Sequence, residues 1–137
     1  MTFLWGYLAA LVIFGVLDAV WLSNMARILY RPTLGDLLLE NLRWLPALAF
    51  YFLFPLGVVH FAVIPALTGG GVVMALVNGG FLGLLAYATY DLTNYATLRA
   101  WTATLTVVDV LYGTVATAIV AAGAYGWLRL IAGWGWI

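Results

Sequence analysis

The sequence predicts an all-α fold, an integral membrane four-helix bundle that forms one domain over residues 1–137, with a short interfacial helix between helices 1 and 2. Of the 137 residues, 66% are hydrophobic and only 7% are charged, whereas a soluble domain has about a quarter charged residues. No charged side chain occurs in residues 1–17, 44–90 or 110–128. This composition excludes a soluble globular domain, a disordered chain and a nucleic-acid binder.

The apolar blocks predict four membrane spans, at about residues 2–23, 46–67, 72–95 and 103–130. A spanning helix needs about 20 mostly apolar residues, so the middle block is too long for one helix. We expect it to turn at Pro65–Gly71, where one Pro and three Gly interrupt the apolar pattern. The runs are continuous and lack the alternation of barrel strands.

The charged residues between the spans predict the orientation in the membrane. Residues 36–45 (DLLLENLRWL) combine leucines with charged and polar residues, which favours a short amphipathic helix at the membrane interface. One side of the membrane receives four arginines and the opposite side one. The four are Arg27, Arg31, Arg43 and Arg99, and the single one is Arg129. The positive-inside rule therefore predicts cytoplasmic long loops and both termini on the non-cytoplasmic side.

Three aspartates inside the spans are the candidate functional residues. A charged side chain at mid-bilayer costs at least about 2.5–3.5 kcal/mol, and such residues commonly mark ligand or ion pathways. Each acid is expected roughly 6–9 Å inside the same membrane face. We therefore predict a polar site open to the cytoplasm that binds an ion or a ligand, with the three acids as candidate metal ligands. Its residues are Asp18, Asp91, Thr93, Asn94, Asp109 and Tyr112.

A structural interpretation competes with this site. In it, each acid pairs with Arg27, Arg31 or Arg99, or hydrogen-bonds across helices to fix their packing. The chain has no Cys and a single His, so it lacks thiolate ligands and histidine clusters, and no cofactor is recognisable.

Small residues predict close packing of the third and fourth spans. Gly79 and Gly83 form a Gly-x-x-x-Gly pattern, and Gly113 is followed by small residues at the same spacing. Such patterns allow helices to approach closely. They favour packing within one chain, and a homo-oligomer through the same glycines is the alternative.

Three sequence motifs resemble one family over essentially the whole chain. They are Leu17–Leu22 (LDAVWL), Tyr90–Leu98 (YDLTNYATL) and Val108–Thr114 (VDVLYGT). The resemblance is to domain-of-unknown-function family 2177 of small bacterial four-helix membrane proteins. It implies a multi-pass protein of the bacterial inner membrane and singles out the same three aspartates, but it implies no activity.

Three functions follow as hypotheses. The first is transport or binding of a small cation, a proton or a small ligand by the carboxylate cluster, although only Asn78 and His60 would continue a polar path to the other side. The second is an enzyme, or partner of an enzyme, acting on a membrane lipid. The third is a structural or assembly subunit. A hydrated passage on a symmetry axis favours the first. A lipid-shaped cleft open to the bilayer beside Asp91 favours the second, and a sealed bundle with every Asp paired to Arg favours the third. Membrane lipids are the expected partners.

Overall fold

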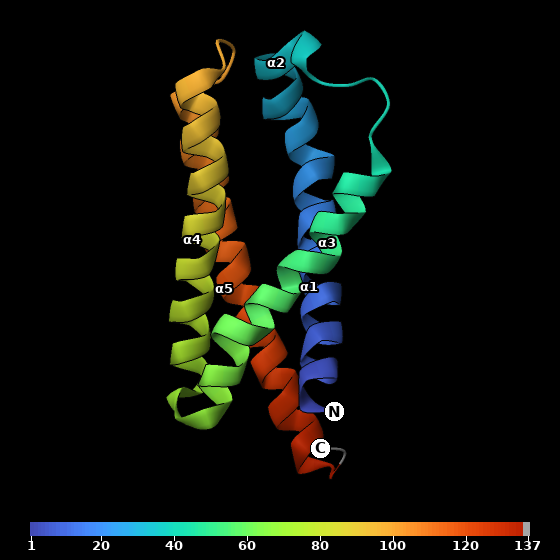
Figure 1. Cartoon of the computed structure of the whole chain (residues 1–137), viewed down its shortest axis with the longest axis vertical. Coiled ribbons are helices and arrows are strands. Elements are labelled where there is room, and N and C mark those ends of the chain that lie inside the picture. The colour runs from blue at the N-terminus through green and yellow to red at the C-terminus, as the bar shows by residue number, and fades with distance from the viewer. Residues whose placement is uncertain (136–137) are drawn as a thin grey trace.

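The protein, described here from a computed structural model over residues 1–135, is almost entirely helical, and this range contains no strand (Figure 1). The long helices are α1 (Thr2–Met25), α3 (Trp44–Val58), α4 (Gly71–Thr97) and α5 (Ala103–Gly133). The short helical segments are η1 (Ala26–Tyr30), α2 (Arg31–Leu34), η2 (Gly35–Leu37), η3 (Val59–Val63) and η4 (Ala66–Gly70).

Three continuous helical segments of the described chain are long and apolar enough to cross a membrane: Thr2–Leu37, Trp44–Thr97 and Ala103–Gly133. The second contains both α3 and α4, which Figure 1 shows as separate arms joined at their lower ends. The chain turns there at Gly69 (φ 153°) and Gly71 (φ 64°), dihedrals that glycine adopts without a steric penalty. The predicted turn is therefore present at the glycine end of Pro65–Gly71. The number of membrane crossings stays a prediction.

The linker after α1 differs from the expectation. Helical backbone continues from α1 through η1 and α2 to Leu37, well beyond the predicted end of the first span. Leu38 (ψ 135°) and Arg43 (ψ 98°) are extended, so the helix predicted over residues 36–45 is wrong. The helical turns end with η2 at Leu37, because Gly35 adopts φ 49° and Leu38 then leaves the helical region.

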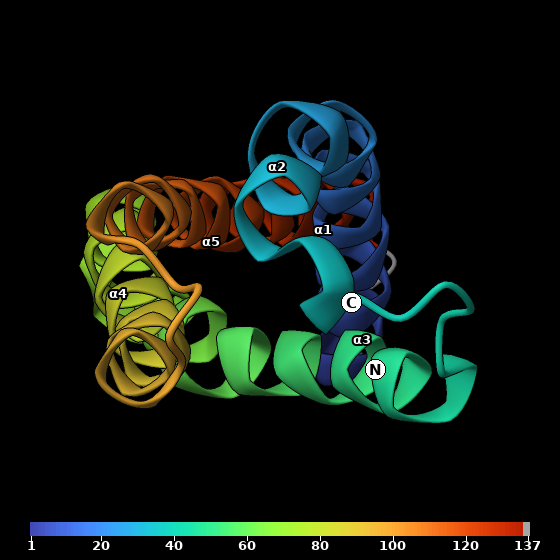
Figure 2. The same cartoon turned by 90° about the horizontal axis from the view of Figure 1, so that it is seen from above.

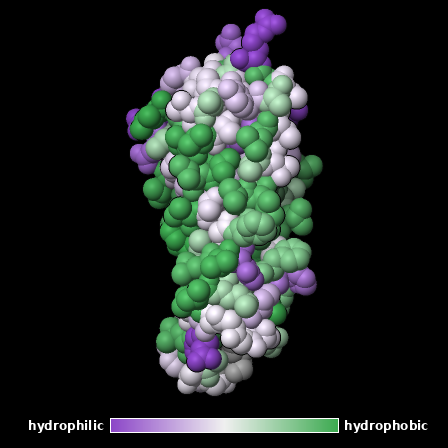
Figure 3. All heavy atoms as spheres, turned by 90° about the vertical axis from the view of Figure 1, so that its left-hand side faces the viewer, coloured by the Kyte–Doolittle hydropathy of each residue, from purple (hydrophilic) through white to green (hydrophobic). Residues whose placement is uncertain are grey.

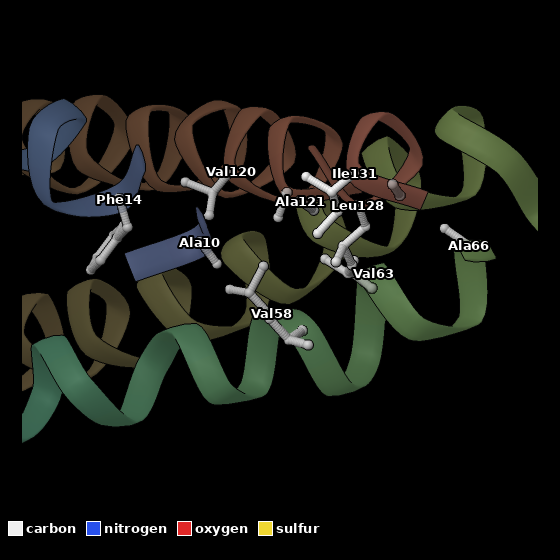
Figure 4. Close-up of a cluster of buried hydrophobic side chains, with 13 residues drawn as sticks. Ala10, Phe14, Val58, Val63, Ala66, Val120, Ala121, Leu128 and Ile131 are labelled. Atoms are coloured by element: carbon white, nitrogen blue, oxygen red, sulfur yellow. The ribbon is translucent and has the colours of Figure 1, made fainter. Parts of the chain in front are cut away.

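An apolar core fills the half of the bundle that carries the two termini. Eleven residues of α5 are buried, more than in any other helix of the described chain. One cluster brings together Phe14 of α1, Val58 of α3, Val63 of η3, and Val120 and Leu128 of α5 (Figure 4). The outer surface is also apolar: Figure 3 shows hydrophobic side chains over the middle of the face on the α4 side.

The predicted glycines lie at the contact between α4 and α5. A Cβ atom added to Gly79 would lie 2.6 Å from Ala121 Cβ, and one added to Gly83 would lie 2.3 Å from the Gly113 carbonyl oxygen. A Cβ on Gly113 would meet the Tyr87 ring at 2.1 Å. All three glycines are therefore used in close packing within this chain.

Candidate functional site: a pocket of carboxylates and aromatic rings

All three predicted aspartates are buried, but they do not share one cavity. Asp18 and Asp109 are each 7% exposed and Asp91 is 0% exposed. Asp18 and Asp109 line a cavity of about 970 Å³ at the end of the bundle opposite the termini. Its walls come from α1, η1, α2, the linker, α4 and α5, which surround this end of the molecule in the view from above (Figure 2).

Tyrosine hydroxyls hold the Asp18 carboxylate. Tyr51 of α3 donates a hydrogen bond to Asp18 Oδ2, and Tyr112 of α5 donates one to Asp18 Oδ1 at 3.1 Å. Asp18 therefore connects three helices that are distant in sequence. These two contacts fix the orientation of the Asp18 carboxyl group and of both tyrosine rings.

A second hydrogen-bonded chain ends on Asp109. The Trp21 indole Nε1 donates to the Tyr30 hydroxyl at 2.8 Å, and Tyr30 donates to Asp109 Oδ1. Trp21 also stacks on Tyr112, with ring centroids 3.9 Å apart and an interplanar angle of 8°. The two carboxylates are thus connected through Tyr30 and the stacked pair Trp21–Tyr112.

Asp91 occupies a different environment. Within the described chain, neither of its carboxylate oxygens has a hydrogen-bond partner, and it does not line the large cavity. It follows Tyr87 by one turn on the face of α4 that packs on α5, in electrostatic range of Asp109. A buried polar group without a partner lowers stability.

The remaining predicted site residues lie outside the pocket. The Thr93 side chain is exposed, and its hydroxyl donates to the carbonyl oxygens of Thr89 (2.5 Å) and Tyr90 (3.0 Å) on its own helix. Asn94 is half-buried and does not line the cavity. Both residues follow Asp91 in the sequence motif, but the helix directs them away from Asp18 and Asp109.

The pocket has an excess of acidic groups. Asp18, Asp109 and Glu40 line it together with one basic side chain, Arg31, a formal excess of two negative charges. Among residues 1–135, none of the arginines predicted as partners (Arg27, Arg31 and Arg99) forms an ion pair with any of the three aspartates. The same residues contain no group of three His, Cys, Asp or Glu side chains placed to hold a metal ion.

Aromatic side chains are the part of the site that the sequence did not reveal. Six of them line the cavity: Trp21, Tyr30, Tyr87, Tyr90, Trp101 and Tyr112. Only Tyr112 was assigned to the site from sequence, although Trp21 and Tyr87 also lie one helical turn from an aspartate. That spacing is the available signal, because residues three or four apart share a helix face.

Long apolar helices and buried carboxylates define the class of protein as an α-helical membrane protein. The family described as "Predicted membrane protein (DUF2177)" matches residues 3–126, and the chain belongs to this family. The resemblance seen in the sequence motifs is thereby confirmed. No curated protein and no solved structure matches the chain.

Proposed function

We propose that this membrane protein binds a small organic cation in the pocket of Asp18 and Asp109. The observation that carries the proposal is the combination of these two carboxylates with the stacked pair Trp21–Tyr112 in one large cavity. Aromatic faces attract ammonium groups through the ring quadrupole, and aromatic cages are used to recognise quaternary ammonium ions. The negative charge excess of the lining supplies the complementary sign.

Binding is better supported than passage through the chain. Beneath the pocket, Phe14 lies one turn from Asp18 and belongs to the apolar core that fills the other half of the bundle. Toward the far end, Asn78 donates to the Phe61 carbonyl oxygen at 3.2 Å and His60 is exposed. Among the described residues, no continuous series of polar groups leads from the pocket to the end that carries the termini, which supports a binding site that opens at one end only.

Equilibrium binding tests the proposal. The protein is reconstituted in lipid nanodiscs and titrated with radiolabelled tetramethylammonium, with empty nanodiscs as the blank. We expect saturable binding that Asp109→Asn weakens by at least about tenfold, since one charge-assisted contact is worth about 1.5–3 kcal/mol. Asp36→Asn, which removes an acid outside the cavity lining, is the matched control. Equal binding by wild type and Asp109→Asn would reject the proposal.

The proposed arrangement is four membrane crossings with both termini on the non-cytoplasmic side of the inner membrane. The segment Trp44–Thr97 has 54 residues, about 80 Å of helix, whereas the hydrocarbon core is about 30 Å thick. Its turn at Gly69–Gly71 supports two crossings. The four arginines at the opposite end of the bundle support a cytoplasmic pocket.

Single cysteines test the arrangement, because the natural chain has none. Leu39→Cys lies in the exposed linker and Thr68→Cys in the exposed turn. A membrane-impermeant maleimide added to intact cells should label Cys at position 68 and leave position 39 unlabelled until the cells are opened. Labelling of both positions in intact cells would contradict the four crossings, and the reverse pattern would contradict the orientation.

A further inference from the structure

A second cavity opens beside the pocket. It has a volume of about 300 Å³ and is lined by Phe50 of α3, by Ala86, Tyr87 and Tyr90 of α4, and by Asp109 of α5. Three of these residues, Tyr87, Tyr90 and Asp109, also line the large cavity. The two cavities are therefore adjacent, and Tyr87, Tyr90 and Asp109 form part of the wall of both.

This side opening lies where α3 and α4 diverge. α4 packs against η3 and η4 at the lower end of the molecule, while α3 diverges from α4 toward its N-terminal end and crosses α1 on the way (Figure 1). Two aromatic residues that line this cavity are about half exposed: Phe50 is 44% exposed and Tyr90 is 57% exposed. In the proposed arrangement both helices cross the membrane, which places this opening toward lipid.

We infer that the ligand is a cationic amphiphile from the bilayer, whose ammonium head group lies between Asp18 and Asp109 and whose alkyl chain leaves between α3 and α4. This inference rests on the proposed function, because it uses the same acidic pocket for the head group. It adds an apolar exit at the level of Asp109, which a small water-soluble cation does not need. The apolar residues Phe50 and Ala86 on the two sides of that exit suit an alkyl chain.

The energetic consequence is that the ligand keeps its chain in apolar surroundings while bound. If the alkyl chain of the bound ligand lay in water, the ligand would lose roughly fourfold in affinity for each methylene group exposed. A ligand entering from the side avoids this loss. Measured against its free aqueous concentration, a long-chain ammonium should therefore bind at least about tenfold more tightly than tetramethylammonium.

The test compares tetramethylammonium with dodecyltrimethylammonium, both below micelle-forming concentrations, on nanodisc-embedded protein with empty nanodiscs as the blank. Ala86→Trp fills the side cavity, and Ala96→Trp, at an exposed position of the same helix outside both cavities, is the matched control. We expect Ala86→Trp to abolish the advantage of the long chain while changing tetramethylammonium binding less than twofold. Ala96→Trp should retain the advantage.

A second measurement needs no substitution. A dodecyltrimethylammonium analogue with a photoreactive group at the chain end should label residues of α3 and α4 around Phe50 and Ala86, as read by mass spectrometry. An equal affinity for long and short ammonium ions, or labelling confined to other helices, would overturn the side entry while leaving cation binding intact. Absence of binding by both ions would instead refute the proposed function.

Discussion

The packing of α4 on α5 gives the most quantitative prediction. A Cβ atom at Gly83 would lie 2.3 Å from the Gly113 carbonyl oxygen and 2.6 Å from Thr117 Oγ1. The first of these atoms belongs to the backbone, so relief requires the two helices to separate. Overpacking of this kind costs about 1–3 kcal/mol, and we expect Gly83→Ala to fall in the upper part of that range. The gain in helix propensity, about 1 kcal/mol at most, offsets it only in part.

The matched control is Gly15→Ala on α1, where nothing lies within 4 Å of the added Cβ. A net loss of about 2 kcal/mol corresponds to a fall in Tm of about 8 °C for a chain of this size. Thermal unfolding in detergent, followed by intrinsic fluorescence, should show this fall for Gly83→Ala and an unchanged or higher Tm for Gly15→Ala. Equal Tm values for the two variants would refute the close packing of α4 on α5.

The polar groups of the bundle give two further predictions. Asp91→Ala should leave the Tm unchanged or raise it, because it removes a buried carboxyl group without a partner. Asp18→Ala should instead lower the free energy of unfolding by about 1–3 kcal/mol, since it leaves two tyrosine hydroxyls without their acceptor. A destabilised Asp91→Ala would contradict this description of Asp91. Tyr51→Phe should lower the free energy of unfolding by about 1.5–3 kcal/mol in the natural background and by little in the Asp18→Ala background. An equal decrease in both backgrounds, measured by denaturant unfolding, would show that the Tyr51–Asp18 hydrogen bond contributes nothing to stability.

The helical segments were predictable because hydrophobicity and backbone chemistry act locally. The predicted segments 72–95 and 103–130 agree with α4 and α5 to within three residues, and the turn appears at Gly69 and Gly71, where the backbone adopts positive φ. The linker was harder to predict. The leucines after Asp36 suggested an amphipathic helix, but the course of the backbone there depends on the conformation of Gly35.

The site was predictable in part, for a physical reason. A carboxylate in an apolar segment needs compensation wherever it lies, so Asp18 and Asp109 were recognisable from sequence alone. Their partners were not, because Tyr30 and Tyr51 are far from these acids along the chain and tyrosines are also common at membrane interfaces. The separate position of Asp91 depends on the rotation of α4 about its axis, which the spacing of charges in the sequence does not determine.

The most direct test of the central claim is the position of a bound cation. Intermolecular NOEs would be recorded between the methyl protons of tetramethylammonium and the ring protons of the selectively labelled protein in nanodiscs. The acidic aromatic pocket predicts contacts to Trp21 and Tyr112, which disappear in Asp109→Asn. Contacts confined to Trp127, in the half of the bundle that carries the termini, or no contacts to any ring, would contradict it.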